Sequence, residues 1–184
     1  MIKSFHAVCV GLALTVGAFA GAAEPIETKH VTVVPSTPAG PLAPGAPMTL
    51  ALDVTPKRTM HVYAPAPKSP GARSSAPRAA SEGLIPVSLK IDADPAITVG
   101  AVQFAKPEFR KVLDETQLVY STPFRIAQDV TLAATPALRD RARTPGATVT
   151  IKGTLRYQAC DDAICYVPVN VPVTWTVALE RTAR

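Results

Sequence analysis

Two runs of alternating apolar and polar residues near the C-terminus constrain the fold more than any other feature of this chain. The apolar or small positions are Val149, Ile151, Gly153, Leu155 and Tyr157 in the first run and Val169, Val171, Val173, Trp175 and Val177 in the second. A period of two puts successive side chains on opposite faces, as in a strand with one buried and one solvated face. The short connection, residues 159–168, predicts that the two strands form an antiparallel hairpin.

Proline within the second run predicts where that strand lies in its sheet. Pro172 falls on the polar face of the run. Because proline has no amide hydrogen, it cannot donate to a sheet ladder and is found at edges or bulges. We therefore expect the second strand to lie at a sheet edge or to contain a bulge.

The remainder of the chain reads as short strands separated by turn residues. The expected strands cover residues 31–34, 48–54, 60–63, 84–91, 97–104, 118–121 and 124–132. Residues 24–29 read as a flexible lead-in, and residues 64–83 as a long mobile surface loop that is either a functional flap or an insertion. One helical turn is expected over residues 135–141, with Thr135 as N-cap and Pro136 at the first helical position. This pattern favours an all-β fold, an antiparallel sandwich of two sheets in one domain.

The N-terminus has the pattern of an export signal. Lys3 precedes an uncharged apolar run over residues 7–20 and then a stretch of small residues, which is typical of a secretory signal peptide. Cleavage fits after Ala20 or after Ala23, and we favour Ala23, so residues 1–23 would be the signal and residues 24–184 the mature domain. The apolar run is too short for a confident membrane span. No stable membrane insertion is expected.

The net charge of +5 comes from scattered basic residues, as on an ordinary solvated surface. There is no patch of interleaved basic and aromatic residues, so nucleic-acid binding is disfavoured. No Ser-His-Asp order, phosphate-binding glycine loop or carboxylate pair stands out, which disfavours hydrolase and nucleotide-binding functions.

Removal of the signal leaves two cysteines, Cys160 and Cys165, on the connection of the C-terminal hairpin. Export to an oxidising compartment makes one intramolecular disulfide the expected outcome. Closing so small a ring stabilises a fold by only about 2 kcal/mol in the chain-entropy model. Two interpretations follow: a disulfide that undergoes exchange, or a hairpin staple that never turns over.

The residues around the cysteines bear on that choice. Asp161 and Asp162 lie inside the ring and disfavour a nearby thiolate, which raises the pKa of the thiols. Such cysteines suit exchange within a docked complex, where the thiolate of a partner attacks the disulfide. Four intervening residues do not fit a thioredoxin site, which has two.

The segments 157–160 and 165–168, Tyr-Gln-Ala-Cys and Cys-Tyr-Val-Pro, resemble the active-site hairpin of the N-terminal periplasmic domain of the thiol:disulfide interchange reductase DsbD. His-Val-Tyr-Ala-Pro at residues 61–65 is similar to a motif of that family, and residues 106–120 resemble its cap-loop segment. The similarity spans residues 31–179. It implies an immunoglobulin-like β-sandwich with a cysteine-bearing hairpin, located in the periplasm.

The resemblance also implies a function and a site. The chain would be a thiol:disulfide oxidoreductase component, passing electrons from a thioredoxin-like or membrane-embedded reductase to periplasmic disulfide proteins, with no cofactor. The domain to which the resemblance extends contains no group that supplies electrons, so the electron donor would be a separate protein. Cys165 would be the sulfur attacked and Cys160 the resolving cysteine. Other implied residues, which line or cap the site, are Tyr63, Leu113, Asp114, Tyr157 and Tyr166.

Two other functions compete with electron transfer. The first is a non-catalytic periplasmic binding or assembly module with a structural hairpin disulfide. The second is metal delivery through the two cysteines and a histidine, but two thiolates give only two ligands and the spacing fits no standard zinc module. We therefore expect no bound metal. His61, at the end of a strand, is expected to be structural or exposed.

Overall fold

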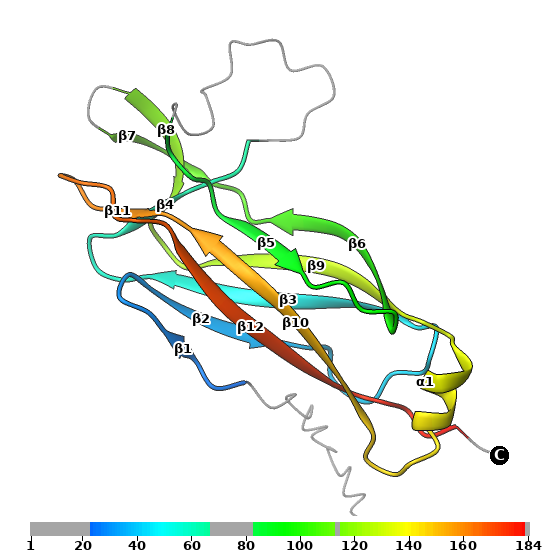
Figure 1. Cartoon of the computed structure of the whole chain (residues 1–184). Coiled ribbons are helices and arrows are strands. Elements are labelled where there is room, and N and C mark those ends of the chain that lie inside the picture. The colour runs from blue at the N-terminus through cyan, green and yellow to red at the C-terminus, as the bar shows by residue number, and fades with distance from the viewer. Residues whose placement is uncertain (1–22, 67–82, 113–114, 183–184) are drawn as a thin grey trace, which may run out of the picture.

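The computed structural model describes residues 23–66, 83–112 and 115–182 (Figure 1). One helix, α1, covers Pro136–Arg141. The strands are β1 Ile26–Glu27, β2 Val31–Ser36, β3 Pro47–Pro56, β4 His61–Tyr63, β5 Ser88–Ile91, β6 Ile97–Phe104, β7 Glu108–Val112, β8 Glu115–Tyr120, β9 Phe124–Leu132, β10 Thr148–Tyr157, β11 Ala159–Cys160 and β12 Val169–Ala178. Within these described ranges, no helix has the length and apolar character that a membrane crossing requires.

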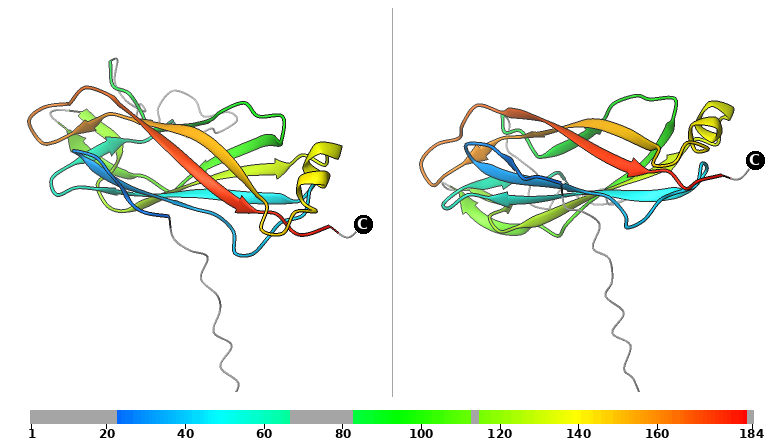
Figure 2. Two further views of the ribbon diagram at one scale, coloured as in Figure 1. Left: turned by 60° about the horizontal axis from the view of Figure 1, so that its bottom comes forward. Right: turned by 90° about the horizontal axis from the view of Figure 1, so that it is seen from below.

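The strands pair antiparallel in three sheets. A five-stranded sheet has the order β1-β2-β3-β9-β6, a three-stranded sheet β12-β10-β5, and a four-stranded sheet β11-β4-β8-β7. The five-stranded and three-stranded sheets form the two layers of a sandwich, which is clearest when the molecule is seen from below (Figure 2). The four-stranded sheet lies at one end of the molecule and α1 at the other (Figure 1). The predicted all-β antiparallel sandwich is confirmed.

The core fills the space between the two layers. Trp175, on β12, is 1% exposed, and its indole nitrogen donates a hydrogen bond of 3.0 Å to the carbonyl oxygen of Ala51 on β3 of the opposite layer. The alternating positions of β10 point inward as their period predicts, from Val149 to Tyr157. On β3, the residues predicted to share a face are all buried: Met48, Leu50, Leu52 and Val54.

Several elements match the prediction, and others differ from it. The strands expected at residues 97–104 and 124–132 are β6 and β9, and Thr135 caps α1 by accepting a hydrogen bond from the Leu138 amide. The expected flexible lead-in is wrong, because β1 pairs with β2 through Ile26 and Val33. The strand expected from residue 84 begins only at Ser88, because the Ile85 amide bonds to the side chain of Gln158 instead of to a ladder partner.

Pro172 lies in an edge strand, which is one of the two positions expected for it. β12 ends the three-stranded sheet, and its register with β10 runs without a shift from Thr148 opposite Ala178 to Tyr157 opposite Val169. Pro172 is exposed and pairs with Thr154. The edge position therefore accommodates the missing amide hydrogen, and no bulge is needed.

Close approach of β5 to β10 depends on Gly153. A Cβ atom on this residue would lie 2.7 Å from the carbonyl oxygen of Lys90 and 3.2 Å from the Ile91 side chain. The first distance is shorter than any tolerable contact with backbone, so a larger residue would push the two strands apart. Among the described residues, β5 pairs only with β10, and it directly follows the segment whose Ile85 amide bonds Gln158, so this spacing also supports the cysteine connection.

We predict that Gly153→Ala lowers the free energy of unfolding by about 1–3 kcal/mol, because the added methyl group displaces the backbone of β5. Urea denaturation followed by Trp175 fluorescence measures this change. The matched control is Lys152→Ala, on the exposed face of the same strand, which should change stability by less than about 0.5 kcal/mol. Equal stabilities for Gly153→Ala and the unmodified protein would contradict the close packing of β5 on β10.

Candidate functional site

The connection between β10 and β12 crosses from one sheet to another. β10 and β12 stay paired up to Tyr157 and Val169, but β11 then pairs with β4 of the four-stranded sheet, with Cys160 opposite His61. The Gln158 side chain holds this crossing: its oxygen accepts from the Ile85 amide at 2.8 Å, and its nitrogen donates to the Tyr166 carbonyl at 3.1 Å. The cysteines therefore lie on a small secondary hairpin beyond the end of the main one.

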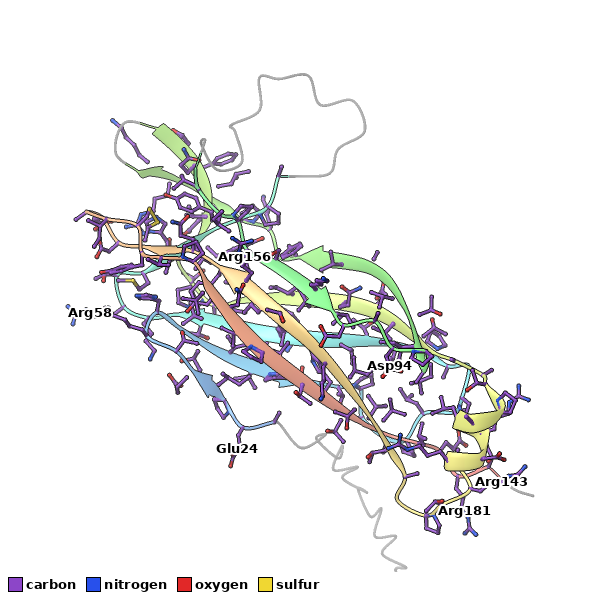
Figure 3. All side chains as sticks on the ribbon, viewed as in Figure 1. Glu24, Arg58, Asp94, Arg143, Arg156 and Arg181 are labelled. Atoms are coloured by element: carbon purple, nitrogen blue, oxygen red, sulfur yellow. A yellow bond between two sulfur atoms is a disulfide. The ribbon has the colours of Figure 1, made fainter. Side chains whose placement is uncertain are left out.

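Cys160 and Cys165 are joined by a disulfide, with their Cα atoms 4.0 Å apart. Backbone hydrogen bonds flank the bridge on both sides, from the Tyr166 amide to the Ala159 carbonyl at 2.9 Å and from the Asp161 amide to the Ile164 carbonyl at 3.0 Å. In Figure 3 the labelled Arg58 lies toward the end of the molecule that carries this hairpin, and Arg143 and Arg181 lie at the opposite end. The bridge is thus at the tip of the sandwich.

The two cysteines differ sharply in exposure. Cys160 is 0% exposed and packs with Tyr63 and Val119 in a cluster separate from the main core. Cys165 is exposed. The Tyr63 hydroxyl lies 3.7 Å from the Cys165 sulfur, and because a disulfide sulfur carries no hydrogen, the hydroxyl is the donor of this weak hydrogen bond. An incoming thiolate can therefore approach Cys165 but not Cys160.

Asp161 fixes the tip of the hairpin. One carboxylate oxygen accepts hydrogen bonds of 2.8 Å from the amides of Ala163 and Ile164, and the other accepts from the Tyr166 hydroxyl at 2.8 Å. The Ile164 and Ala163 amides, followed by the Tyr166 hydroxyl, hold the pKa of Asp161 below its usual value of 3.8. The same hydroxyl bond raises the pKa of Tyr166. Asp161 thus stays ionised and shapes the loop.

Asp162 joins the hairpin to a neighbouring element. Its carboxylate is 2.5 Å from the guanidinium of Arg110 on β7, and the same guanidinium donates to the Ser121 hydroxyl at 3.1 Å. β7 and β8, the two strands on either side of the expected cap residues, pair from Glu108 opposite Val119 to Val112 opposite Glu115. The ion pair neutralises one of the two charges that were expected to oppose a thiolate.

Tyr166 and Tyr157, both expected to line the site, occupy different environments. The Tyr166 ring stacks on His30 with centroids 4.4 Å apart, and the Lys29 ammonium lies 5.3 Å from its centroid. Tyr157 is 1% exposed within the main core, and its hydroxyl shares a hydrogen bond of 2.8 Å with Thr28. Tyr166 therefore borders the disulfide loop directly, whereas Tyr157 supports the loop from the core side.

His61, expected to be structural or exposed, is buried in β4. It is 0% exposed, and neither ring nitrogen has a hydrogen-bond partner among the residues that the structure describes. Its ring meets that of Tyr63 edge-on, with centroids 5.7 Å apart. His61 and Tyr63 are two positions apart on β4, so their side chains lie on the same face of the strand. This could have been predicted from the sequence. The register that puts His61 opposite Cys160 could not have been predicted in this way.

The remaining predicted site residues, Leu113 and Asp114, lie outside the described residues. In the part of the chain that the structure describes, no three His, Cys, Asp or Glu side chains come together as a metal-binding group. Three exposed apolar side chains lie on the same elements: Ile164 and Val167 on the cysteine connection, 57% and 82% exposed, and Phe109 on β7, 64% exposed.

Comparison with known proteins gives one family match. The family model described as "Thiol:disulfide interchange protein DsbD, N-terminal" matches residues 30–175. No curated protein is significantly similar in sequence.

The solved structures that the chain resembles include two N-terminal domains. The reduced N-terminal domain of DsbD from Neisseria meningitidis is 17% identical, with 79% of this chain and 86% of that chain covered and a TM-score of 0.44. The N-terminal periplasmic domain of ScsB from Proteus mirabilis is 12% identical, with 86% of this chain and 50% of that chain covered and a TM-score of 0.48.

We predict that the order of the hairpin tip depends on ionised Asp161. Because its pKa is lowered in the folded protein, its contribution is present above its ordinary pKa and is lost as the pH falls through the folded value. Amide hydrogen exchange of Ala163 and Ile164, corrected for intrinsic rates, should therefore accelerate below that range. At neutral pH, Asp161→Ala should accelerate the same two amides several-fold. Asp162→Ala is the control, since Asp162 accepts no bond from these amides, and equal effects of the two variants would contradict the prediction.

Proposed function

Because the chain belongs to the family of DsbD N-terminal domains, matched over residues 30–175, we propose that Cys160 and Cys165 form a redox-active pair that cycles between dithiol and disulfide. In this role the domain accepts electrons from a thioredoxin-like or membrane-embedded thiol:disulfide reductase and delivers them to periplasmic disulfide proteins. The immunoglobulin-like sandwich with its cysteine hairpin is the fold that the family implies.

The observation that carries the proposal is the unequal exposure of the two cysteines. Thiol–disulfide exchange is an in-line attack by a thiolate on one sulfur, which forms a mixed disulfide and releases the other sulfur. The exposed Cys165 can be attacked, and the buried Cys160 stays within the protein as the leaving and resolving group. A cysteine pair that reacts with a docked partner protein needs one exposed and one buried sulfur. A structural disulfide has no need for an accessible sulfur.

Reduction then follows in two steps. The thiolate of the donor attacks the Cys165 sulfur; a donor–Cys165 bond forms, the Cys160–Cys165 bond breaks, and Cys160 takes the electron pair. A second thiolate of the donor then attacks the donor sulfur of the mixed disulfide; the donor's own disulfide forms, the donor–Cys165 bond breaks, and Cys165 leaves as a thiolate. Delivery runs in the opposite sense, when the Cys165 thiolate attacks a substrate disulfide and Cys160 then displaces the substrate sulfur.

The surroundings of Cys165 support docking of a partner. Ile164 and Val167 border it in sequence, and Phe109 lies on the strand that the Arg110–Asp162 pair joins to the loop. Exposed apolar groups around a reactive sulfur supply contact area that excludes water. Tyr63, Tyr166, Leu113 and Asp114 complete the proposed site, the last two as cap residues.

Export is part of the proposal. Domains of this family are periplasmic, and a signal peptide over residues 1–23 would deliver the mature domain, residues 24–184, to that compartment. Nearly all of the signal, residues 1–22, lies outside the described residues.

The competing function, a binding or assembly module with a permanent disulfide, finds less support. The loop already has its own restraints: two amide bonds and one hydroxyl bond to Asp161, and two hydrogen bonds to Gln158. Because these hydrogen bonds already hold the loop and the disulfide closes only a small ring, the disulfide adds little to the stability of the fold.

We predict that the reduction potential of the Cys160–Cys165 pair lies above about −300 mV, the range of exchange-active rather than structural disulfides. Equilibration of the purified domain with dithiothreitol and glutathione couples, followed by thiol trapping and mass measurement, gives this value. A markedly lower potential, together with equal rates of reduction by thioredoxin and by a small thiol, would instead support the permanent staple.

We also predict that the two single-cysteine variants differ in trapping. Cys160→Ser should form a lasting mixed disulfide through Cys165 with a thioredoxin-like protein that keeps only its first active-site cysteine, supplied as its disulfide with thionitrobenzoate. The Cys165 thiolate attacks the thioredoxin sulfur, thionitrobenzoate leaves, and no resolving thiol remains to break the new bond. Cys165→Ser, which retains only the buried Cys160, is the matched control and should form little adduct. Similar yields from both variants, visible on non-reducing gels, would be inconsistent with the assigned roles.

A further inference from the structure

Release of Cys160 as a thiolate raises a difficulty that the proposed function leaves open. Cys160 is 0% exposed, and its neighbours in the cluster are Tyr63, Val119 and the partly buried Leu84. A charge released among apolar groups, away from water, is strongly disfavoured unless a partner compensates it. The same surroundings oppose loss of the thiol proton when Cys160 must attack. A neighbouring group that donates a hydrogen bond to the released thiolate and accepts the thiol proton during attack would resolve both steps.

His61 is positioned for this task. It is the direct cross-strand partner of Cys160 in the β11–β4 pair. Side chains of directly opposite residues project from the same face of an antiparallel pair, with Cβ atoms about 4.5–5.5 Å apart. Within the described part of the chain, both ring nitrogens of His61 are buried without a hydrogen-bond partner, which normally carries a cost that structures avoid. A polar group kept unpaired at this place is available to a proton that arrives during the reaction.

We propose that neutral His61 accepts the proton of Cys160 in the resolving step and, through its ring N–H, donates a hydrogen bond to the Cys160 thiolate when it is released. This inference rests on the proposed function and deepens it. In the resolving step a ring nitrogen of His61 takes the proton of the Cys160 thiol, and the Cys160 sulfur attacks Cys165. The Cys160–Cys165 bond forms, the Cys165–substrate bond breaks, and the substrate leaves as a thiolate with the electron pair. The imidazolium then loses its proton to solvent.

The electrostatic surroundings suit a neutral base. Burial lowers the pKa of His61 from its usual value of 6.5, and the positive charge of Arg110 on β7 acts in the same direction. Asp162 and Asp161 on the cysteine loop and Glu108 on β7 act in the opposite direction but more weakly. Because the net shift is downward, His61 is neutral at neutral pH and able to accept a proton. A transient imidazolium would be compensated by the Cys160 thiolate itself.

Ellman's reagent isolates the step in question without a protein partner. The reduced domain attacks the reagent through Cys165, releases one thionitrobenzoate and retains the other as a mixed disulfide. Attack by Cys160 then releases the second, so the two absorbance phases report the two cysteines separately. In the unmodified domain we expect the second phase to be nearly independent of pH across the neutral range, because neutral His61 accepts the proton.

In His61→Gln, whose amide can hydrogen-bond but cannot take a proton, the second phase should slow by at least about tenfold at neutral pH. Its rate should rise in proportion to hydroxide concentration and approach that of the unmodified domain at alkaline pH. The first phase should change less than twofold. His61→Phe keeps an aromatic ring against Tyr63 and should behave in the same way, so it provides the test if His61→Gln does not fold.

His30→Gln is the matched control. His30 is also buried, and its ring nitrogens have no partner in the described ranges, but it stacks on Tyr166 and does not pair with Cys160. It should retain the pH-independent second phase. A second phase in both His61 variants that keeps the rate and pH independence of the unmodified domain would overturn the inference, as would equal slowing in the His30 variant.

The outcome is separable from that of the proposed function. Failure of exchange with thioredoxin-like proteins, with a His61-dependent second phase intact, would reject the electron-transfer role but retain the proton acceptor. Exchange that proceeds with a second phase indifferent to His61 would reject only the proton acceptor.

Discussion

Pairing of β11 with β4 is the interaction on which the reactive end of the molecule depends. This pair contains only Ala159 opposite Val62 and Cys160 opposite His61, yet it draws the connection of the β10–β12 hairpin onto another sheet. Without it, both cysteines would lie on a solvated loop with similar exposure. With it, Cys160 is enclosed and Cys165 remains outside, so a local register decides the chemical roles of the two sulfurs.

The sandwich supplies the rigidity that this short pair lacks. Trp175 joins the two layers through its bond to the Ala51 carbonyl, and the β10–β12 ladder runs unbroken to Tyr157, three residues before Cys160. Gln158 then ties the crossing to the residues that precede β5. The sulfurs are thus held by a continuous path of ladder and side-chain bonds from the core, and only the final turn rests on Asp161.

Much of this architecture could be predicted from periodicity. The alternation in β10 and β12, the bounds of β6 and β9, and Thr135 as helix cap follow from local chemistry. β7 was missed because Glu-Phe-Arg-Lys-Val has no clean period, and β1 because two residues are too few to show one. The position of His61 was missed for a deeper reason, since pairing between residues 99 positions apart leaves no trace in either segment alone.

The edge position of Pro172 has a consequence for how the protein behaves in a crowded compartment. An open strand edge invites addition of a strand from another chain, which is a common route to aggregation. β12 is long and regular, and four of its ten residues are buried apolar side chains, so it would be a strong template. Proline in the middle of the strand removes one of the donors that an added strand would use. The same residue that the sheet tolerates at its border therefore helps to keep neighbouring copies apart.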